Sequence, residues 1–143
     1  MLMADRFEIE IVTPDRLVVK DHAEEIQIPG KNGYLGILAG HAPLITELDV
    51  GEITYRTNVH TERLAVAWGF AEVLPDKVTV LAETAERAGE IDVARAQEAK
   101  QRAEEKLKSG DPDVNYPRAL NALRRAEVRL KVATEGTPTA AHQ

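Results

Sequence analysis

The chain of 143 residues contains no cysteine, so disulfide bridges and cysteine-ligated metal sites are excluded. Zero cysteine also fits a reducing compartment. Ser109 is the only serine, which disfavours a Ser-His-Asp hydrolase. The sequence lacks the GxxxxGK(S/T) loop that cradles phosphates, so we do not expect this chain to hydrolyse ATP by itself.

Long apolar segments are also missing. No run approaches the ~20 residues that span a bilayer, and residues 1–7 lack the layout of a secretory signal peptide. We therefore expect a cytosolic chain whose membrane association comes from a partner. His22, His41 and His60 lie in unrelated stretches without metal-ligand spacing, so no metal site is predicted. A surface or packing role is favoured for His41.

Hydrophobic residues make up 43% of the chain and charged residues 29%, which is typical of a globular protein. The charge is divided unevenly. Residues 1–89 hold eight Lys and Arg against 15 Asp and Glu, whereas residues 90–143 hold ten against nine. The acidic first part argues against nonspecific nucleic-acid binding. Near the end lies a cationic stretch that favours an acidic partner or a phosphate group: Arg118, Arg124, Arg125, Arg129 and Lys131.

Residues up to about 86 follow a period of two. Phe7, Ile9 and Ile11 are apolar while the residues between them are acidic, as in a strand with one buried face. Further short strands are predicted at residues 17–19, 25–28, 44–45, 53–55, 64–67, 70–73 and 78–81. No helical pattern of 10–15 residues separates them. We therefore expect an antiparallel β-sandwich or flattened barrel rather than a parallel α/β sheet.

Residues 28–45 contain four glycines between two prolines: Gly30, Gly33, Gly36 and Gly40. Glycine is needed where the backbone takes a positive φ or where another chain comes close. Asn32-Gly33 is a strong hairpin signal. The apolar residues between the glycines can be buried, so we predict a rigid, tightly turned β surface with a defined tip.

Past residue 89 the period becomes helical. One helical face carries Ala96, Ala99, Ala103 and Leu107, and a second segment repeats with 4-3-4-3 spacing at Ala119, Leu123, Ala126, Leu130 and Ala133. Residues 109–112 end the first helix, and Asp113 or Asn115 can cap the second. The two helices should form an antiparallel hairpin. The predicted organisation is a sandwich over residues 1–88, a hairpin over 89–134 and a disordered tail over 135–143.

The helix seams are mostly alanine, which contributes one methyl group per residue, and burial yields only ~0.8 kcal/mol per methylene. A hairpin held weakly against the β part, able to swing away, is compatible with these seams. A permanently docked hairpin is equally compatible.

Three segments resemble the epsilon subunit of F-type ATP synthases, in its bacterial and chloroplast form. They are IPGKNGYLGILAGHAPLIT, GFAEVLPDKVTVLAETAE and IDVARA, and the resemblance extends from about residue 7 to residue 132. It implies an N-terminal β-sandwich followed by a C-terminal helical hairpin. Trp68 departs from the pattern, because the family often has a small residue there. Trp68 and Phe70 are predicted to be sandwich core or contacts with the gamma subunit.

The resemblance implies a non-catalytic rotor subunit of a proton-translocating ATP synthase, on the cytoplasmic face of the bacterial cell membrane. Implied partners are the gamma subunit, the ring of c subunits and, through an extended inhibitory hairpin, the catalytic alpha/beta hexamer. The loop facing the c ring would comprise Lys31, Asn32, Gly33 and Tyr34, with His41 nearby. Acidic segments of the catalytic subunits would meet Arg124, Arg125, Arg129 and Lys131.

Asp92, Arg95 and Ala96 match the motif at which some bacterial members bind a regulatory ATP, and the resemblance implies no required cofactor. Arginines at positions 95 and 102 share a helical face, as do those at 125 and 129, and guanidinium groups from two helices could clamp a triphosphate. The full implied set is Glu86, Ile91, Asp92, Arg95, Ala96, Arg102, Arg125 and Arg129, with Mg²⁺ left open. The alternative is a solvated face of Glu and Arg pairs, worth ~0.3–0.5 kcal/mol each.

Two rival functions remain from the residues alone. One is a β-sandwich ligand-binding module with a helical oligomerisation tail, which would not form a one-to-one pair with gamma. The other is a small metal-dependent enzyme of cupin type, which the histidine spacing disfavours.

Overall fold

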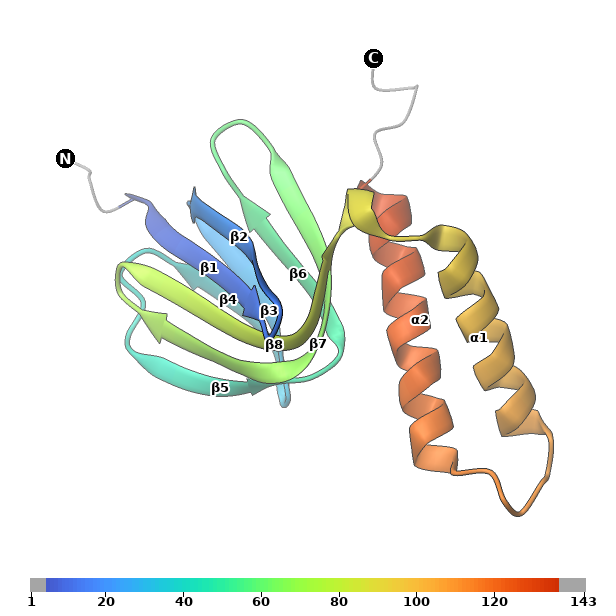
Figure 1. The fold of residues 1–143 in the computed structure, drawn as a ribbon. Coiled ribbons are helices and arrows are strands. Elements are labelled where there is room, and N and C mark those ends of the chain that lie inside the picture. Colours follow the sequence, from blue (N-terminus) through green and yellow to red (C-terminus); the bar gives the residue numbers. More distant parts are fainter. Residues whose placement is uncertain (1–4, 137–143) are drawn as a thin grey trace.

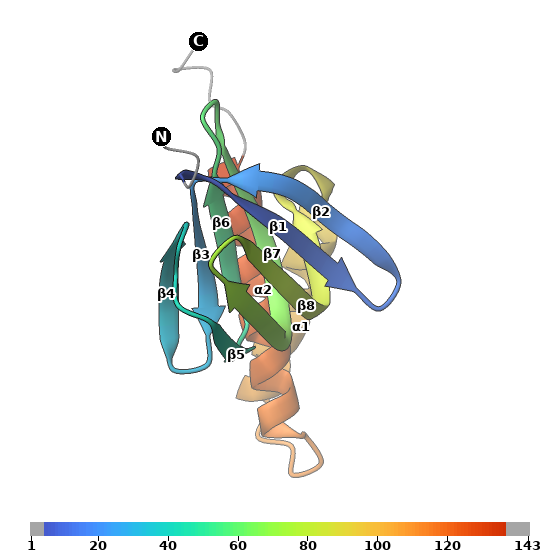
Figure 2. The same ribbon diagram turned by 90° about the vertical axis from the view of Figure 1, so that its left-hand side faces the viewer.

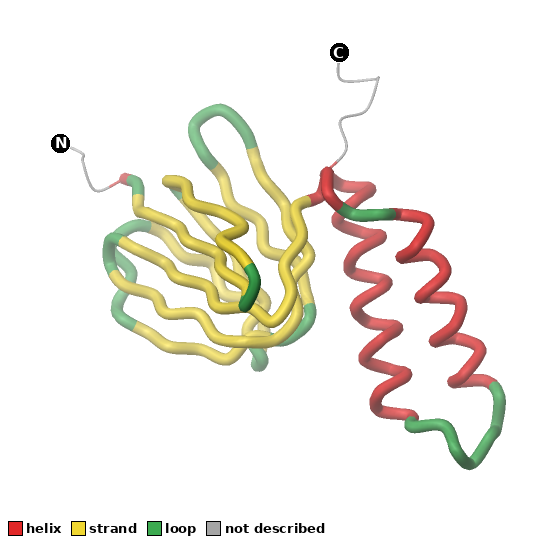
Figure 3. The backbone as a smooth tube through the Cα atoms, in the orientation of Figure 1, coloured by secondary structure: helices red, strands yellow, loops and turns green. Residues whose placement is uncertain are grey.

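The computed structural model describes residues 5–136, in which a β-sandwich is followed by two antiparallel helices (Figure 1). This confirms the predicted fold class. The strands are β1 (Phe7–Thr13), β2 (Arg16–Ala23), β3 (Glu25–Gly30), β4 (Gly33–Leu38), β5 (Leu44–Leu48), β6 (Gly51–Arg56), β7 (Thr61–Leu74) and β8 (Lys77–Arg87). A short 3-10 turn, η2 (Ala88–Glu90), leads into α1 (Val93–Lys108) and α2 (Tyr116–Gly136). Figure 3 shows the same division between strands and helices.

Strand β7 is central to the sheet because it is long enough to pair with two sets of neighbouring strands. One edge pairs with β8, and the other pairs with β6 and then with β5. The strand bends at Trp68 and Gly69, whose φ angles are +52° and +123°. A Cβ at Gly69 would lie 2.0 Å from the carbonyl oxygen of Leu81, so only glycine fits there. The sequence predicted two strands in this region; the structure has one, because the left-handed pair redirects the backbone without ending the pairing.

The strand order is β2-β1-β8-β7-β5-β3-β4, and β6 pairs with both β3 and β7. Figure 2 shows β3 and β4 on one side of the sandwich and β1 and β2 on the other. The pair between β1 and β8 is parallel, unlike the antiparallel pairing expected throughout. The tip between β3 and β4 turns at Lys31 and Asn32, since Gly30 pairs with Gly33. The turn is thus one residue earlier than the Asn32-Gly33 signal indicated.

The sandwich has a core of its own. Every second residue of β1 is buried, and the buried cluster consists entirely of residues between 7 and 85. Tyr55 is the largest fully buried side chain, and its hydroxyl donates a hydrogen bond to Asp21 at 3.0 Å. Burial raises the pKa of Tyr55 to about 12. This buried cluster therefore contains no residue of the two helices.

The helices begin and end at capping groups. Asp92 accepts a hydrogen bond from the backbone N–H of Arg95 at 3.1 Å, and Asn115 accepts one from the backbone N–H of Arg118 at 3.1 Å. Asn115, not Asp113, therefore caps the second helix. Five of the alanines predicted in the seams are buried: Ala96, Ala103, Ala119, Ala126 and Ala133.

α2 lies between the sandwich and α1 (Figure 1). It continues through Gly136, where it approaches Ala88 so closely that an added Cβ would lie 2.2 Å from that alanine's Cβ. Residues 135 and 136, predicted in the tail, are therefore helical, because packing against η2 extends the helix. The rest of the predicted tail, residues 137–143, lies outside the described residues. No helix within residues 5–136 is long and apolar enough to cross a membrane.

Candidate functional site

α2 docks on the sandwich through a small apolar patch. Ala65 from β7 and Ile91 before α1 meet Val132 and Ala133 of α2, with Val128 packed alongside. Val132 is completely buried. Burying a Val or Ile contributes ~1.5–3 kcal/mol, and the alanines contribute less. Apolar contact therefore stabilises docking by an amount that other interactions can offset.

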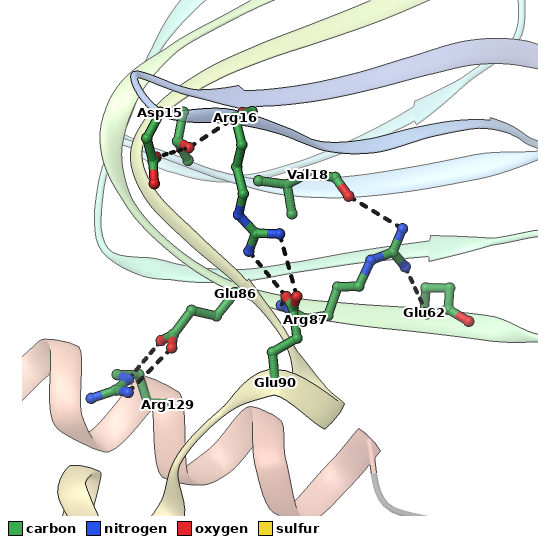
Figure 4. A network of polar contacts seen from close by, with 9 residues as sticks. Asp15, Arg16, Val18, Glu62, Glu86, Arg87, Glu90 and Arg129 are labelled. Atoms are coloured by element: carbon green, nitrogen blue, oxygen red, sulfur yellow. Dashed lines mark hydrogen bonds and ion pairs between the residues drawn. The ribbon is translucent and has the colours of Figure 1, made fainter.

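Ion pairs flank this patch. Arg129 donates two hydrogen bonds to Glu86 of β8, from Nε to Oε1 at 2.7 Å and from Nη2 to Oε2 at 3.2 Å (Figure 4). Arg124 Nη2 lies 2.9 Å from Asp49 Oδ2 in the connection between β5 and β6. The hydrogen bond from Arg124 holds the pKa of Asp49 below its usual value. Both pairs are partly exposed, so each is worth up to about 1 kcal/mol.

Between these two pairs, the guanidinium carbon of Arg125 lies 5.2 Å from the centroid of the Trp68 ring. This distance is within the range of a cation–π interaction. Trp68 occupies the left-handed bend of β7 described above. The bend thus places an indole directly under α2.

A pair of carboxylates lies near the end of α2. Glu52 is 8% exposed, and its carboxylate lies 3.3 Å from Arg63 Nη1 and 3.7 Å from Lys131 Nζ. Arg63 Nη1 also lies 3.6 Å from Glu135. Burial, followed by the neighbouring Glu135 carboxylate, raises the pKa of Glu52. Docking of α2 therefore brings the carboxylates of Glu52 and Glu135 next to the same Arg63 side chain.

These contacts account for the cationic stretch of the sequence. Four of the five basic residues of that stretch contact the sandwich in this structure: Arg124, Arg125, Arg129 and Lys131. Three of them bind carboxylates, and the fourth lies over Trp68. The acidic sandwich and the basic α2 therefore have complementary charges where they meet in the docked state.

The segment that leads to the hairpin is fixed to the sandwich. Arg16 on β2 donates two hydrogen bonds to Glu90, at 3.2 and 3.3 Å (Figure 4). Arg87 donates to the carbonyl oxygen of Val18 at 3.3 Å, and its backbone N–H donates to Glu90 at 3.0 Å. The hydrogen bond from Arg16 lowers the pKa of Glu90. These contacts attach the segment that precedes α1 to strand β2.

A cleft of about 980 Å³ opens between the hairpin and the sandwich. Strand β8 and the β1–β2 turn form one wall, and alanines of both helices line the other. The cations that line it are Arg16, Arg102, Lys106, Arg118, Arg125 and Arg129, and the sandwich contributes Asp15, Glu83 and Glu86. Arg102, Lys106 and Arg118 form no ion pair with any residue between 5 and 136. Such a cleft suits an anion with a flat, uncharged part, because guanidinium groups bind phosphate and alanines leave room for a ring.

The residues implied for ATP divide into two groups. Four of them line the cleft together: Glu86, Arg102, Arg125 and Arg129. The other four do not. Ile91 and Ala96 are buried packing residues, Asp92 caps α1, and Arg95 lies outside the lining.

The sequence interpretation left Arg16, Lys106 and Arg118 out of the site. Arg118 and Lys106 could have been found, because positions 118, 125 and 129 share one helical face, as do 102 and 106. Arg16 gave no such signal, since β2 reaches the cleft only through the tertiary fold.

The structure does not bring His41 to the loop predicted to face the c ring. Lys31 lies at the β3–β4 turn, where its Nζ is 3.2 Å from Glu47. Tyr34 folds back, and its hydroxyl accepts a hydrogen bond from the backbone N–H of Glu52 at 2.9 Å. His41 lies beyond the other end of β4, next to Gly40, whose N–H donates to Pro75 at 2.7 Å. Figure 1 shows these two loops at separate ends of β4.

An apolar row crosses the outer face of the sandwich. Leu17, Val12, Leu81 and Phe70 are paired in register across β2, β1, β8 and β7. Three of these residues, Leu17, Leu81 and Phe70, are between 52% and 55% exposed to solvent. Phe70 is therefore not a core residue. Contiguous exposed apolar residues of this kind mark a contact surface.

No group of His, Asp or Glu side chains in the described part of the chain could hold a metal ion. The three histidines discussed above remain in separate places, on β2, in the β4–β5 loop and in the β6–β7 loop.

Comparison with known proteins gives consistent matches over the whole fold. The family model described as "ATP synthase, Delta/Epsilon chain, beta-sandwich domain" matches residues 6–88, and the one described as "ATP synthase, Delta/Epsilon chain, long alpha-helix domain" matches residues 90–134. The chain is 70% identical over 139 residues to the ATP synthase epsilon chain of Koribacter versatilis, covering 97% of this chain and 98% of that one. It is 45% identical over 131 residues to the ATP synthase epsilon chain of Syntrophobacter fumaroxidans, covering 92% and 98%.

Among solved structures, a chain in the OSCP/F1/c-ring assembly of the Euglena gracilis mitochondrial ATP synthase superimposes with a TM-score of 0.78. The two chains are 23% identical, and the match covers 91% of this chain and 82% of that chain. At this identity the likeness concerns the fold.

Proposed function

Because the chain belongs to the epsilon-chain family of F-type ATP synthases, we propose that it is a non-catalytic rotor subunit whose hairpin controls ATP hydrolysis. In this proposal the sandwich is the fixed part and the hairpin is the moving part. The single observation that carries it is the docking interface. The cations of α2 are bound by acids of the sandwich, and an acidic surface of the catalytic hexamer would offer them equivalent partners.

The energetics of the interface favour reversible exchange. Docking depends on one small apolar patch and on partly exposed ion pairs, each worth up to about 1 kcal/mol. The sandwich retains its entire core when the hairpin leaves. A raised hairpin would therefore carry Arg124, Arg129 and Lys131 to the hexamer and block rotation in the direction of hydrolysis.

Two surfaces of the sandwich are suited to the stalk partners. The apolar row of Leu17, Leu81 and Phe70 is exposed and contiguous, which supports docking of the gamma subunit. The β3–β4 turn at Lys31–Tyr34 presents polar, tightly turned backbone, which supports contact with polar loops of the c ring. Through these contacts the chain would sit on the cytoplasmic face of the cell membrane as a peripheral part of the complex.

The test uses two matched pairs of substitutions with opposite expected signs. Asp49→Asn and Glu86→Gln remove only the partners on the sandwich, so undocking becomes easier and ATP hydrolysis by membranes falls. Arg124→Gln and Arg129→Gln remove the cations themselves, so an external acidic partner is lost as well and hydrolysis rises. Hydrolysis that changes in the same direction in both pairs would refute the exchange of partners. Co-purification of gamma with each variant verifies that the complex has assembled.

We also propose that the cleft binds a regulatory ATP, which would hold the hairpin down. The cations Arg102, Arg118 and Arg125 line it from both helices. Ligand at about 100 times its Kd would stabilise the docked state by about 2.7 kcal/mol, which is comparable to the apolar part of the interface. The fraction of chains with a docked hairpin would then increase with the ATP concentration.

Calorimetry on the isolated chain at millimolar ATP tests this second proposal. We expect a heat of binding that Arg102→Gln strongly reduces and Arg95→Gln leaves in place, because only Arg102 lines the cleft. Absence of heat in the unsubstituted chain would refute ATP binding. Loss of heat in Arg95→Gln alone would locate the ligand at the α1 motif, away from the cleft.

A further inference from the structure

Trp68 is the only tryptophan of the chain, and it occupies a backbone position that residues with a Cβ avoid. Its φ angle is +52°, in the left-handed region where the side chain crowds the following carbonyl group. Gly69 continues the same bend and cannot be replaced, because of the Leu81 carbonyl oxygen. A residue with a Cβ is strained in this conformation, so we expect contacts of the Trp68 side chain to offset the strain.

α2 crosses the sandwich at this bend, and its contacts there indicate what the Trp68 side chain does. Three cations along α2 contact three neighbouring segments in turn. Arg124 binds Asp49 between β5 and β6, Arg125 lies over Trp68 on β7, and Arg129 binds Glu86 on β8. The indole contact is therefore central, and the two ion pairs lie on either side of it. Trp68 and Arg125 are both half-buried.

We propose that the Trp68 indole is a latch that holds α2 in the docked position through Arg125. The left-handed bend places the ring under that guanidinium group. The flanking ion pairs weaken as salt increases, whereas a ring face that is shielded by the helix keeps its attraction for the cation. The latch refines the hairpin movement of the proposed function, but it acts in the isolated chain and needs no other subunit.

The absence of cysteine allows a direct measurement of undocking. In a Val132→Cys background the introduced thiol is completely buried in the docked state and is the only thiol of the full chain. Its labelling rate by a thiol reagent reports how often the hairpin leaves the sandwich. All further substitutions are compared within this background.

The experiment is a double-mutant cycle between the two residues. Arg125→Gln should raise the labelling rate about two- to fivefold, the range for a partly exposed cation–π contact. Trp68→Leu should do the same, and the double variant should label no faster than either single variant. Trp68→Phe, which keeps a ring, should retain part of the coupling and replaces Trp68→Leu in the cycle if that variant does not fold.

Lys100→Gln on α1 is the matched control, because it removes one positive charge from the hairpin away from the ring, and its rate should not change. The increase caused by Arg125→Gln should persist at about 0.5 M salt, while that caused by Arg129→Gln should shrink. Multiplicative effects of the Trp68 and Arg125 substitutions would overturn the latch, as would equal effects of Arg125→Gln and Lys100→Gln. Failure of the proposed inhibition of hydrolysis would leave this cycle unaffected, so the two outcomes are separable.

Discussion

Val132 offers the sharpest test of how strongly the hairpin is held. It is completely buried between α2 and the sandwich, and Val132→Ala removes two methyl groups from that contact. At ~0.8 kcal/mol per buried methylene equivalent, the lost transfer energy is about 1.6 kcal/mol, and the remaining cavity adds a few tenths. The substitution should therefore weaken docking by about 2 kcal/mol, or roughly 30-fold in the docking equilibrium.

The single tryptophan provides the assay, because Trp68 contacts α2 only when the hairpin is docked. In a urea titration, Val132→Ala should lower the midpoint of the fluorescence change by about 1–2 M, for a dependence of about 1–2 kcal/mol per molar urea. Val93→Ala is the matched control, since Val93 is 43% exposed at the start of α1, and it should shift the midpoint little. Equal shifts in the two variants would show that the patch does not hold the hairpin.

Three other predictions follow from the same contacts. Because the docked hairpin raises the pKa of Glu52, docking takes up a proton: its contribution is complete below the undocked pKa and is lost as pH rises through the docked pKa. The urea midpoint should thus be higher in mildly acidic solution than at neutral pH, and Glu52→Gln should abolish the difference; a difference that survives would exclude Glu52 as its source. Gly69→Ala should destabilise the sandwich by more than about 3 kcal/mol or prevent folding, since its Cβ would meet the carbonyl oxygen of Leu81 at 2.0 Å; a melting temperature like that of the parent chain would contradict this. Truncation after Glu90 should leave a folded sandwich that still binds gamma, and loss of β-sheet circular dichroism would show that the core needs the helices.

The period of the apolar residues was sufficient to predict the sandwich, the hairpin and the seam between the helices. Alternation at Phe7, Ile9 and Ile11 and the alanine spacing of the helices are local features that the structure preserves. The single bent β7 was not predictable in this way. Its continuity depends on pairing with β5, β6 and β8, which no local pattern shows. Trp68 and Gly69, the two residues with left-handed conformations, fell between the two strands that the sequence predicted.

The candidate site was predicted less completely, for a related reason. Arg125 and Arg129 were found because they lie four apart on one helix, which is a spacing visible in sequence. The resemblance also implied Glu86, but the contacts of Arg129 with Glu86 and of Arg125 with Trp68 were not predicted, because these partners are far apart along the chain and meet only after folding. His41 was placed near the loop of Lys31 only by the resemblance, and in the structure β4 separates the two.

The two hydrogen bonds between Arg16 and Glu90 have a mechanical consequence. They hold the segment after β8 against β2 just before the hairpin begins, so the pivot of the hairpin is limited to the few residues before Val93. Because the hairpin remains tethered through so short a segment, it stays at high local concentration near its docked place. Redocking of the hairpin would therefore be an intramolecular step whose rate does not depend on the concentration of the protein.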